Sequence, residues 1–420
     1  MTINSDEAFL WQPSRNELTR YLEHTSGDFY VFHKEQFRKN CQRFESTFKK
    51  YYTNTRIAYS VKTNYLPQMI SEIDSLGWYS EAVSGFEYDL AQSLKIEEKN
   101  IIFNGPIKTQ DELSKAIRGG ATINIDSVGE LDRIEYIAVA NKTVAKLGVR
   151  LNFSSALDSD SRFGLPADDT TVSCIQKIID SEYLEFNGLH VHYCFSGKKP
   201  EKYTELVEAV IEFLDTKCPQ LWSSLKTLNF GGGFFSSMPD KMAKNWGGKI
   251  PSFDDYAQAI TTPLNQRLEK DKLPAPQLIL EPGLAVVADA MSFVCRVDSV
   301  KTNIDPACAI LTGSVYNIKP TKSAINLPWI HYQLGSKPIH LKGYLTGFTC
   351  MEDDILDSDF DGSIAPNDAF VFGNVGAYTI VLQPSFIRLA PAVLALEDGE
   401  IITLVNPQTN QEFIKNRFYI

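Results

Sequence analysis

The stretch "RIAYSVKTNYLPQMISEIDSLGWYSEAVS", residues 56–84, contains two short β-like runs separated by one amphipathic segment. The first run ends at Lys62 and the second begins at Trp78. Between them, apolar residues recur at spacings of three and four, which is typical of a helix, and Gly77 supplies a C-terminal stop. A strand, a helix and a strand in this order predict two parallel strands joined by a crossover helix.

This unit is repeated along the middle of the chain. Eight β-like runs cover residues 56–62, 78–84, 101–106, 121–127, 146–153, 186–193, 225–233 and 276–283. Eight consecutive strand–helix units fit a closed (β/α)₈ barrel, an α/β fold, over a length close to the usual one. A doubly wound open sheet is the alternative, but it would require a glycine-rich turn after the first strand, which is absent here. We therefore predict the barrel.

The sequence changes character after about residue 290. Strand-like runs separated by turn residues replace the helical periodicity, for example in "IHLKGYLTGF" (339–348) and "EIITLVN" (400–406). This pattern predicts a C-terminal antiparallel β domain. We assign residues 38–288 to the barrel, and residues 1–37 plus 289–420 to a β-sandwich or barrel-like domain. The early run "DFYVFHKEQF" (28–37) fits either domain and falls in the second under these borders.

Composition excludes several classes of function. The 420 residues carry a formal net charge of -11, which argues against a nucleic-acid partner or an anionic membrane surface. No apolar run approaches the roughly 20 residues of a membrane helix, and the first residues lack the pattern of a signal peptide. The seven cysteines are scattered without a CxxC pair. We therefore expect reduced thiols, a cytoplasmic location and no metal site.

The predicted strand ends carry an unusual set of polar side chains. In such barrels the active site lies at the carboxyl ends of the strands. These ends bring together Lys62, Glu81, Ser84, His192, Gly231, Gly232, Gly233, Glu281 and Gly283. The combination of a lysine, a histidine, a triple glycine and a carboxylate suggests a site for a phosphorylated ring that carries a proton.

Each of these residues has a chemical role and an ordinary alternative. A desolvated Lys62 can act as a Schiff-base nucleophile, although a lone lysine is more often a solvated side chain at the barrel rim. Backbone N–H groups of Gly231–Gly233 can approach a phosphate, or simply form a turn. Glu281 can hold a protonated ring nitrogen or make a structural ion pair. His192 can stack on the ring or lie in the core.

These motifs together resemble the fold-type III pyridoxal-phosphate decarboxylases, the ornithine and diaminopimelate decarboxylase family. "AYSVKTN" resembles the lysine motif, "EAVSGFE" the next strand and "SRFG" a loop motif, while "GLHVHYCFSG", "LNFGGG" and "EPG" resemble the histidine, phosphate and pyridine-nitrogen segments. The resemblance implies pyridoxal 5'-phosphate as cofactor and Lys62 as the Schiff-base lysine. It also implies cofactor contacts from Glu81, Ser84, His192, Ser196, Gly232, Gly233, Glu281 and Gly283.

The resemblance extends into the β domain. "GFTCMEDDIL" resembles the segment whose cysteine, here Cys350, reaches the active site of the partner subunit. Cys350 is then the candidate acid that returns a proton to the substrate Cα after CO₂ has left. "NVGAYT" resembles the segment whose tyrosine, here Tyr378, contacts the cofactor phosphate. The family therefore implies a head-to-tail homodimer with two shared active sites.

Three departures from the family pattern concern the substrate and the phosphate. "HYCFS" has one additional residue before Ser196, Leu284 follows "EPG" in place of an arginine, and Met351 follows Cys350 in place of an acidic residue. Asp354 is the acidic candidate for substrate binding that remains nearby. Lys319 and Arg388 would give the substrate end a positive lining, alongside Lys322.

This positive lining leads to a hypothesis about the substrate. We expect an amino acid with distal acidic or carbonyl groups, such as a conjugated amino acid in siderophore or antibiotic assembly. Diaminopimelate, ornithine, lysine and carboxynorspermidine are the alternative substrates. An amino-acid racemase of the same barrel family is a second enzyme class, but such racemases tend to place arginine at the ring nitrogen. The third class is a catalytically inactive regulatory homologue.

Overall fold

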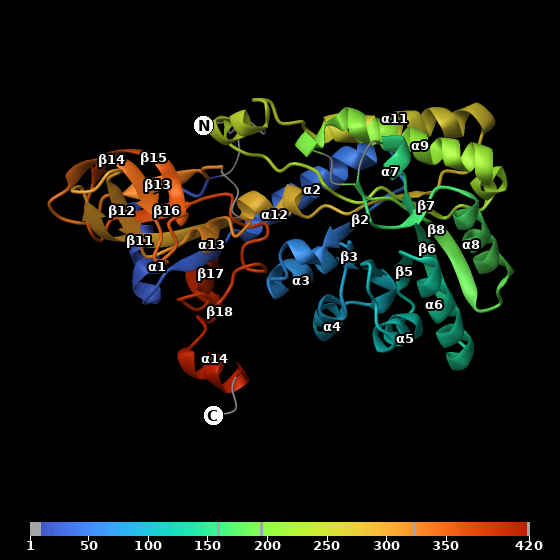
Figure 1. Cartoon of the computed structure of the whole chain (residues 1–420), viewed down its shortest axis with the longest axis horizontal. Helices are drawn as coiled ribbons and strands as arrows, with labels where there is room; N and C mark the ends of the chain where they lie inside the picture. Colours follow the sequence, from blue (N-terminus) through green and yellow to red (C-terminus); the bar gives the residue numbers. More distant parts are fainter. Residues whose placement is uncertain (1–9, 158–159, 194–195, 322–324, 418–420) are drawn as a thin grey trace. The chain divides into compact units, whose positions relative to one another are not determined.

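The computed structural model describes residues 10–157, 160–193, 196–321 and 325–417, without the side chains of residues 155, 156 and 196. It contains two compact units (Figure 1). The barrel unit consists of Asn40–Phe235 and Pro251–Ala285, and the β unit consists of Met1–Lys39, Ser236–Ile250 and Val286–Ile420. Assignment of residues 236–250 to the β unit has no counterpart in the sequence pattern.

The barrel unit is a closed (β/α)₈ barrel, as predicted. Its strands are β2 (Thr55–Ser60), β3 (Tyr79–Ala82), β4 (Ile101–Phe103), β5 (Thr122–Ile125), β6 (Ala145–Asn152), β8 (Leu184–His190), β9 (Thr227–Asn229) and β10 (Gln277–Leu280). Neighbouring strands are parallel, and the β10–β2 and β5–β6 pairings complete the ring. The two-residue strand β7 (Leu165–Pro166) pairs with the end of β6. Each predicted run coincides with one barrel strand.

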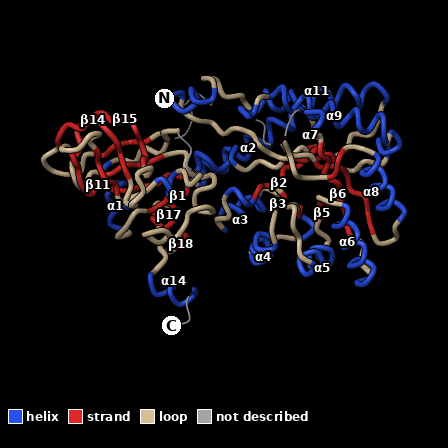
Figure 2. Tube along the Cα trace, viewed as in Figure 1, coloured by secondary structure: helices blue, strands red, loops and turns tan. Residues whose placement is uncertain are grey.

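Helices follow the strands in the expected alternation, and α4, α5 and α6 lie on the outside of the strands (Figures 1 and 2). The longer ones are α2 (Lys34–Tyr51), α3 (Pro67–Ser75), α4 (Gly85–Ser93), α5 (Gln110–Gly119), α6 (Val128–Asn141), α8 (Asp169–Asp180), α9 (Pro200–Lys217) and α11 (Phe253–Asp271). Local signals set their ends: Pro67 occupies the first turn of α3, and Gly120 ends α5 with φ +75°. Within the described ranges, no helix is both long and apolar enough to cross a bilayer.

The β unit contains a mixed sheet. Its strands are β1 (Phe29–Phe32), β11 (Met291–Lys301), β12 (Cys308–Leu311), β13 (Trp329–Tyr332), β14 (Ile339–Thr346), β15 (Ile355–Ile364), β16 (Ala369–Phe372), β17 (Ala392–Glu397) and β18 (Glu400–Val405). The main order is β15-β14-β12-β11-β1-β17-β18, and β16 joins β13 to β11. Most pairings are antiparallel, as predicted, but β1–β17 and β12–β14 are parallel. Short helices α1 (Arg15–His24), α10 (Asp240–Ala243), α13 (Val315–Ile318) and α14 (Asn410–Arg417) complete the unit.

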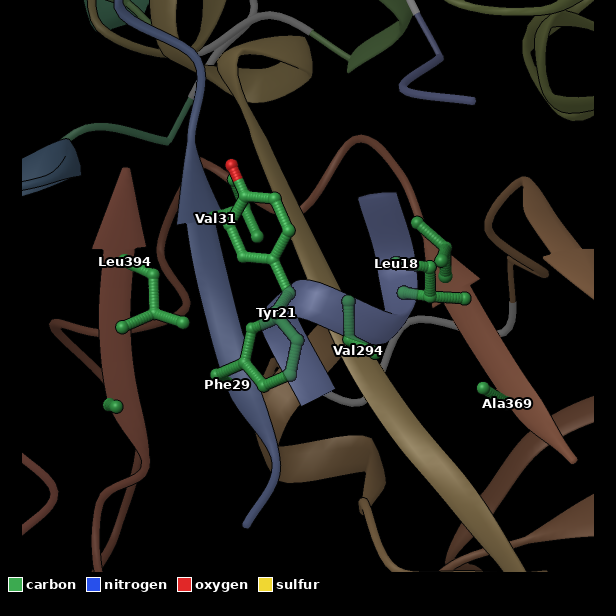
Figure 3. Packing of buried hydrophobic residues seen from close by; sticks show 9 residues of the cluster. Leu18, Tyr21, Phe29, Val31, Val294, Ala369 and Leu394 are labelled. Carbon is green, nitrogen blue, oxygen red and sulfur yellow. The ribbon is translucent and has the colours of Figure 1, made fainter. Parts of the chain in front are cut away.

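Helix α1 covers one face of this sheet (Figure 3). Leu18 and Tyr21 of α1 are buried against side chains of β1, β11 and β17, among them Phe29, Val294 and Leu394. The rings of Tyr21 and Phe29 are stacked with centroids 5.9 Å apart. Because β1 lies between β11 and β17, the run at residues 28–37 supplies a central strand of the β unit.

Candidate active site

Lys62 lies in a 3₁₀ turn, η1 (Val61–Thr63), directly after β2. Its Nζ is 2.6 Å from Glu81 Oε2 and donates to Ser60 Oγ at 3.1 Å. Ser60 Oγ also donates to Glu81 Oε2. The β2–β3 register places Ser60 opposite Glu81, which explains why the three groups meet. Lys62 remains 35% exposed while Glu81 is 1% exposed, so the amine stays accessible and its charge is neutralised from one side.

Glu281, at the end of β10, is held by two asparagines from other strands. Asn104 Nδ2 donates to Glu281 Oε1 at 2.9 Å and to Glu81 Oε1 at 3.0 Å. Asn229 Nδ2 donates to the same Glu281 oxygen at 2.7 Å. His190 Nε2 approaches the other oxygen, Oε2, at 3.4 Å without the alignment of a hydrogen bond. The barrel therefore brings Lys62, Glu81 and Glu281 into one polar cluster.

The electrostatic surroundings fix the charge states of two groups in this cluster. Burial alone would raise the pKa of Glu281, but the adjacent His190 ring and the Lys62 ammonium hold that pKa below its usual range. Desolvation, reinforced by Lys62, lowers the pKa of His192 to about 3. At neutral pH the cluster therefore offers an ionised carboxylate beside an uncharged imidazole.

The triple glycine forms the turn after β9. Gly231 and Gly233 have φ of +64° and +96°, a left-handed conformation that glycine adopts readily. A Cβ on Gly232 would lie 2.2 Å from the carbonyl oxygen of Glu281. The Gly231 N–H donates to Asn229 Oδ1 at 2.9 Å, and the Gly232 N–H donates to His192 Nδ1 at 3.1 Å. The turn is thus tied to the carboxylate cluster and to the predicted ring-stacking histidine.

Gly283 and Ser84 have local structural reasons for their identity. A Cβ on Gly283 would lie 2.0 Å from Thr63 Oγ1, so the turn after β10 can approach the Lys62 turn only with glycine there. Ser84 is the N-cap of α4 and accepts from the Glu87 N–H at 3.3 Å. Burial raises the pKa of Glu87 to about 7, although the Val83 N–H donates to this carboxylate. The Ser196 side chain lies outside the described part of the chain.

The β unit carries the remaining predicted residues. Cys350 is exposed in the loop between β14 and β15. Asp354, four residues later, is 3% exposed. Its carboxylate accepts from Ser314 Oγ at 3.0 Å, the Val315 N–H at 2.7 Å and the Thr349 N–H at 3.0 Å. Asp354 therefore holds the loop of Cys350 in shape, and its oxygens are engaged within the β unit.

The two cations expected at the substrate end are also engaged within the β unit. Lys319 Nζ donates to the carbonyl of Ile325 at 3.2 Å. Arg388 donates to the carbonyl of Thr312 at 2.9 Å, covers the Phe348 ring at 4.7 Å and lies 4.0 Å from Asp28. These contacts give both cations a role in packing the β unit.

Tyr378 has a backbone conformation that a tyrosine rarely adopts. Its φ is +59°, in the left-handed region, and its side chain is half-buried. Residues held in such conformations cost about 1–3 kcal/mol and cluster at functional sites. Of the two residues that the family resemblance indicates in the β unit, Cys350 and Tyr378, Tyr378 therefore has a strained backbone.

The sequence alone did not assign roles to the asparagines. Asn104 ends a predicted strand and Asn229 precedes the triple glycine, so their position was visible. An asparagine in a strand is usually interpreted as a structural residue. Only the register between the strands shows that Asn104 and Asn229 both donate to Glu281.

The chain matches a known protein family over more than half of its length. Residues 34–288 match the family model "Pyridoxal-dependent decarboxylase, pyridoxal binding domain". The diaminopimelate decarboxylase of Methanocaldococcus jannaschii is 26% identical over 378 residues, which cover 85% of this chain and 83% of that protein. The enzyme of the same name from Pseudomonas aeruginosa is 23% identical over 356 residues, covering 82% of this chain and 81% of that one.

Solved structures share the fold over nearly the whole chain. A crystal structure of the M. jannaschii diaminopimelate decarboxylase in complex with L-lysine superposes with a TM-score of 0.84, at 22% identity, covering 96% of this chain and 95% of that one. The lysine/ornithine decarboxylase of Vibrio vulnificus in complex with putrescine gives a TM-score of 0.73 at 19% identity, covering 92% and 99%.

Proposed function

Because the chain belongs to the pyridoxal-dependent decarboxylase family, we propose that it removes one α-carboxylate of diaminopimelate. The cofactor, pyridoxal phosphate, and the reaction class, decarboxylation of an amino acid, follow from family membership. The substrate is our proposal, supported by relatives named diaminopimelate decarboxylase. The observation that carries the reaction is the cluster of Lys62, Glu81, Asn104 and Glu281 at the barrel strand ends.

The residues of this cluster fit pyridoxal phosphate. Glu281 Oε1 accepts two amide hydrogen bonds. Among the described residues, its Oε2 has the poorly aligned His190 beside it, so Oε2 is the oxygen that can receive a ring N–H. The Gly231–Gly233 turn carries no side chains, as close approach of a phosphate to the backbone requires. Lys62 is an accessible amine with a carboxylate beside it that can take up a proton.

When bound, pyridoxal phosphate supplies an acceptor for the electron pair that CO₂ leaves behind. Lys62 is the residue that would hold the cofactor covalently through Nζ. Glu281, kept ionised, would hold a proton on the ring nitrogen. His192, uncharged at neutral pH, would cover the ring without competing for that proton. We assign phosphate contacts to Gly232, Gly233, Gly283 and Tyr378, and a cofactor contact to Ser84. The contact expected from Ser196 falls on a side chain outside the described part of the chain.

The expectation of a conjugated substrate loses its main support. It relied on Lys319, Lys322 and Arg388 as a positive lining. Lys319 and Arg388 already donate to backbone carbonyls of the β unit, and Lys322 lies outside the described residues. The expected role of Asp354 in substrate binding also loses support, because its carboxylate oxygens already accept three hydrogen bonds within the β unit. Lysine and ornithine remain the second candidate substrates, since one structural relative is a lysine/ornithine decarboxylase.

The substrate proposal predicts a ranking of rates. We expect the purified holoenzyme to release CO₂ from diaminopimelate with a kcat/KM more than about tenfold above that for lysine, ornithine or an N-acylated lysine. The measurement is initial-rate CO₂ release, with Lys62→Ala as the background control. A faster rate with lysine, ornithine or the acylated compound would contradict the proposal. Loss of the optical activity of L-lysine or L-ornithine without CO₂ release would instead indicate a racemase.

We further propose that two copies form a head-to-tail dimer in which Cys350 of one subunit serves the other as proton donor. Three large apolar side chains follow the carboxyl ends of successive barrel strands and are exposed: Phe86 (61%), Ile107 (77%) and Val128 (43%). Exposed apolar groups on a single rim are typical of an interaction surface.

The cytoplasmic location expected from the scattered cysteines stays a prediction.

The shared-site proposal predicts complementation between inactive variants. Lys62→Ala and Cys350→Ala should each have low activity alone. After mixing and reassortment of subunits, half of the dimers are mixed and contain one intact site, so about a quarter of the native activity should return. The measurement is CO₂ release before and after mixing, with subunit exchange followed by mass. Activity that stays at the sum of the two variants, despite exchange, would show that each site comes from a single chain.

A further inference from the structure

One amide group bridges the two carboxylates of the active-site cluster. Asn104 Nδ2 lies 3.0 Å from Glu81 Oε1 and 2.9 Å from Glu281 Oε1. All three side chains are buried, with 4% of Asn104, 1% of Glu81 and 4% of Glu281 exposed. An amide nitrogen carries two hydrogens, so one can point to each carboxylate. Both carboxylates must present an unprotonated oxygen to accept these bonds.

A second asparagine fixes which way the Asn104 amide faces. Asn124 Nδ2 donates to Asn104 Oδ1 at 2.7 Å, so a flipped Asn104 amide would set two NH₂ groups against each other. Flipping would also turn the Asn104 oxygen toward two carboxylates. The Asn124 side chain lies against Gly148, its register partner on β6. Any larger residue would collide with it, because a Cβ at position 148 would lie 1.9 Å from Asn124 Oδ1. A glycine inside a strand weakens the strand, and here it makes room for this amide.

The amide pair is supported from behind by a buried ion pair. Lys108 Nζ lies 2.8 Å from Glu130 Oε1 and donates to the backbone carbonyls of Gly105 and Asn124 at 2.8 and 3.1 Å. Gly105 directly follows Asn104, so Lys108 ties together the ends of the two strands that carry the asparagines. The position of the amide pair is therefore determined by the barrel itself.

We propose that Asn104 is a positioning residue that favours the ionised form of Glu281 and leaves Glu281 Oε2 available to the ring nitrogen of pyridoxal phosphate. Two adjacent buried carboxylates repel each other, and without the shared donor Glu281 would take up a proton more readily. A protonated Glu281 would no longer attract the charged ring nitrogen. The other titratable groups around the pair are Lys62, Glu87, His190 and His192. The proposal rests on cofactor binding by the family and not on the identity of the substrate.

The test is a double-mutant cycle on cofactor affinity. Asn104→Leu, which has a similar volume but no donor, should weaken binding of pyridoxal phosphate about 10- to 100-fold, the loss expected for a hydrogen bond to a charged group. In the E281Q background the same substitution should weaken binding by no more than about threefold, because the charge that Asn104 supports is gone. The readout is an absorbance titration of the cofactor-free protein, which needs no substrate.

Controls separate this role from a purely structural one. Asn265→Leu removes a comparable hydrogen bond, from Nδ2 to the carbonyl of Tyr51 at 3.1 Å, far along the chain from the cluster. It should change cofactor affinity by less than about twofold. If Asn104→Leu does not fold, Asn104→Ala provides the same comparison. Thermal unfolding of the cofactor-free proteins shows whether each variant is folded. An equal loss of affinity in the native and E281Q backgrounds would overturn the proposal. A wrong substrate assignment leaves the result unchanged.

Discussion

Lys62→Ala is expected to abolish decarboxylation and to remove the visible absorption band of the covalently bound cofactor. The decrease in kcat should be roughly 10³-fold or more, as is usual when a group that bonds to the reacting molecule is removed. The physical reason is the position of Nζ, which is accessible and lies 2.6 Å from a carboxylate that can take its proton. Alanine supplies no amine at this place. The measurements are CO₂ release and the absorption spectrum after excess cofactor has been removed.

Lys62→Arg is the matched control for charge. A guanidinium keeps a cation facing Glu81 but remains protonated and does not act as an amine nucleophile. We expect the arginine variant to be as inactive as the alanine variant. The alanine variant should lose about 1 kcal/mol more of its free energy of unfolding, a small amount because Lys62 is partly solvent-exposed and its ion pair is screened. Activity in the arginine variant, or a cofactor band in the alanine variant, would contradict the assignment of Lys62.

The barrel could be predicted because its signals are local. Each strand–helix unit carries its own periodicity and end signals, such as Gly77 with φ +73° after α3 and Gly120 after α5. Lys62 and Glu281 could be predicted because strand ends in such a barrel face one site. The roles of Asn104 and Asn229 could not, because they depend on the register of strands distant in sequence. No local pattern distinguishes an amide that donates to a carboxylate from one that holds a turn.

The β unit was less predictable for the same reason. Its strand-like runs were visible, but the parallel pairing of β1 with β17 joins segments some 360 residues apart in the sequence. Charged side chains there were assigned to the substrate from their type alone. Asp354 and Arg388 have contacts within the β unit that the sequence does not encode locally. A charged side chain near a sequence motif can therefore be assigned to substrate binding only when its hydrogen-bond and ion-pair partners within the protein are known.

Glu281→Gln is expected to lower kcat on the order of 10²-fold at saturating cofactor, which is the usual loss when a preorganised electrostatic partner is removed. Glutamine keeps the shape of the side chain and can still accept the amide hydrogen bonds from Asn104 and Asn229. It carries no charge to hold the proton on the ring nitrogen, so the cofactor becomes a weaker electron acceptor. Unchanged kcat at saturating cofactor would show that Glu281 only packs the barrel.

The same substitution should change how stability depends on pH in the cofactor-free protein. The pKa of Glu281 is lower in the folded state than its unfolded value of about 4.3, because His190 and Lys62 favour the carboxylate. Its stabilising contribution is therefore present above about pH 4.3 and is lost as the pH falls. We expect the free energy of unfolding of the native protein to fall more steeply between pH 6 and pH 3 than that of Glu281→Gln, measured by urea denaturation. Parallel curves would mean that neighbouring charges do not hold Glu281 ionised, and the proton on the ring nitrogen would then need another partner.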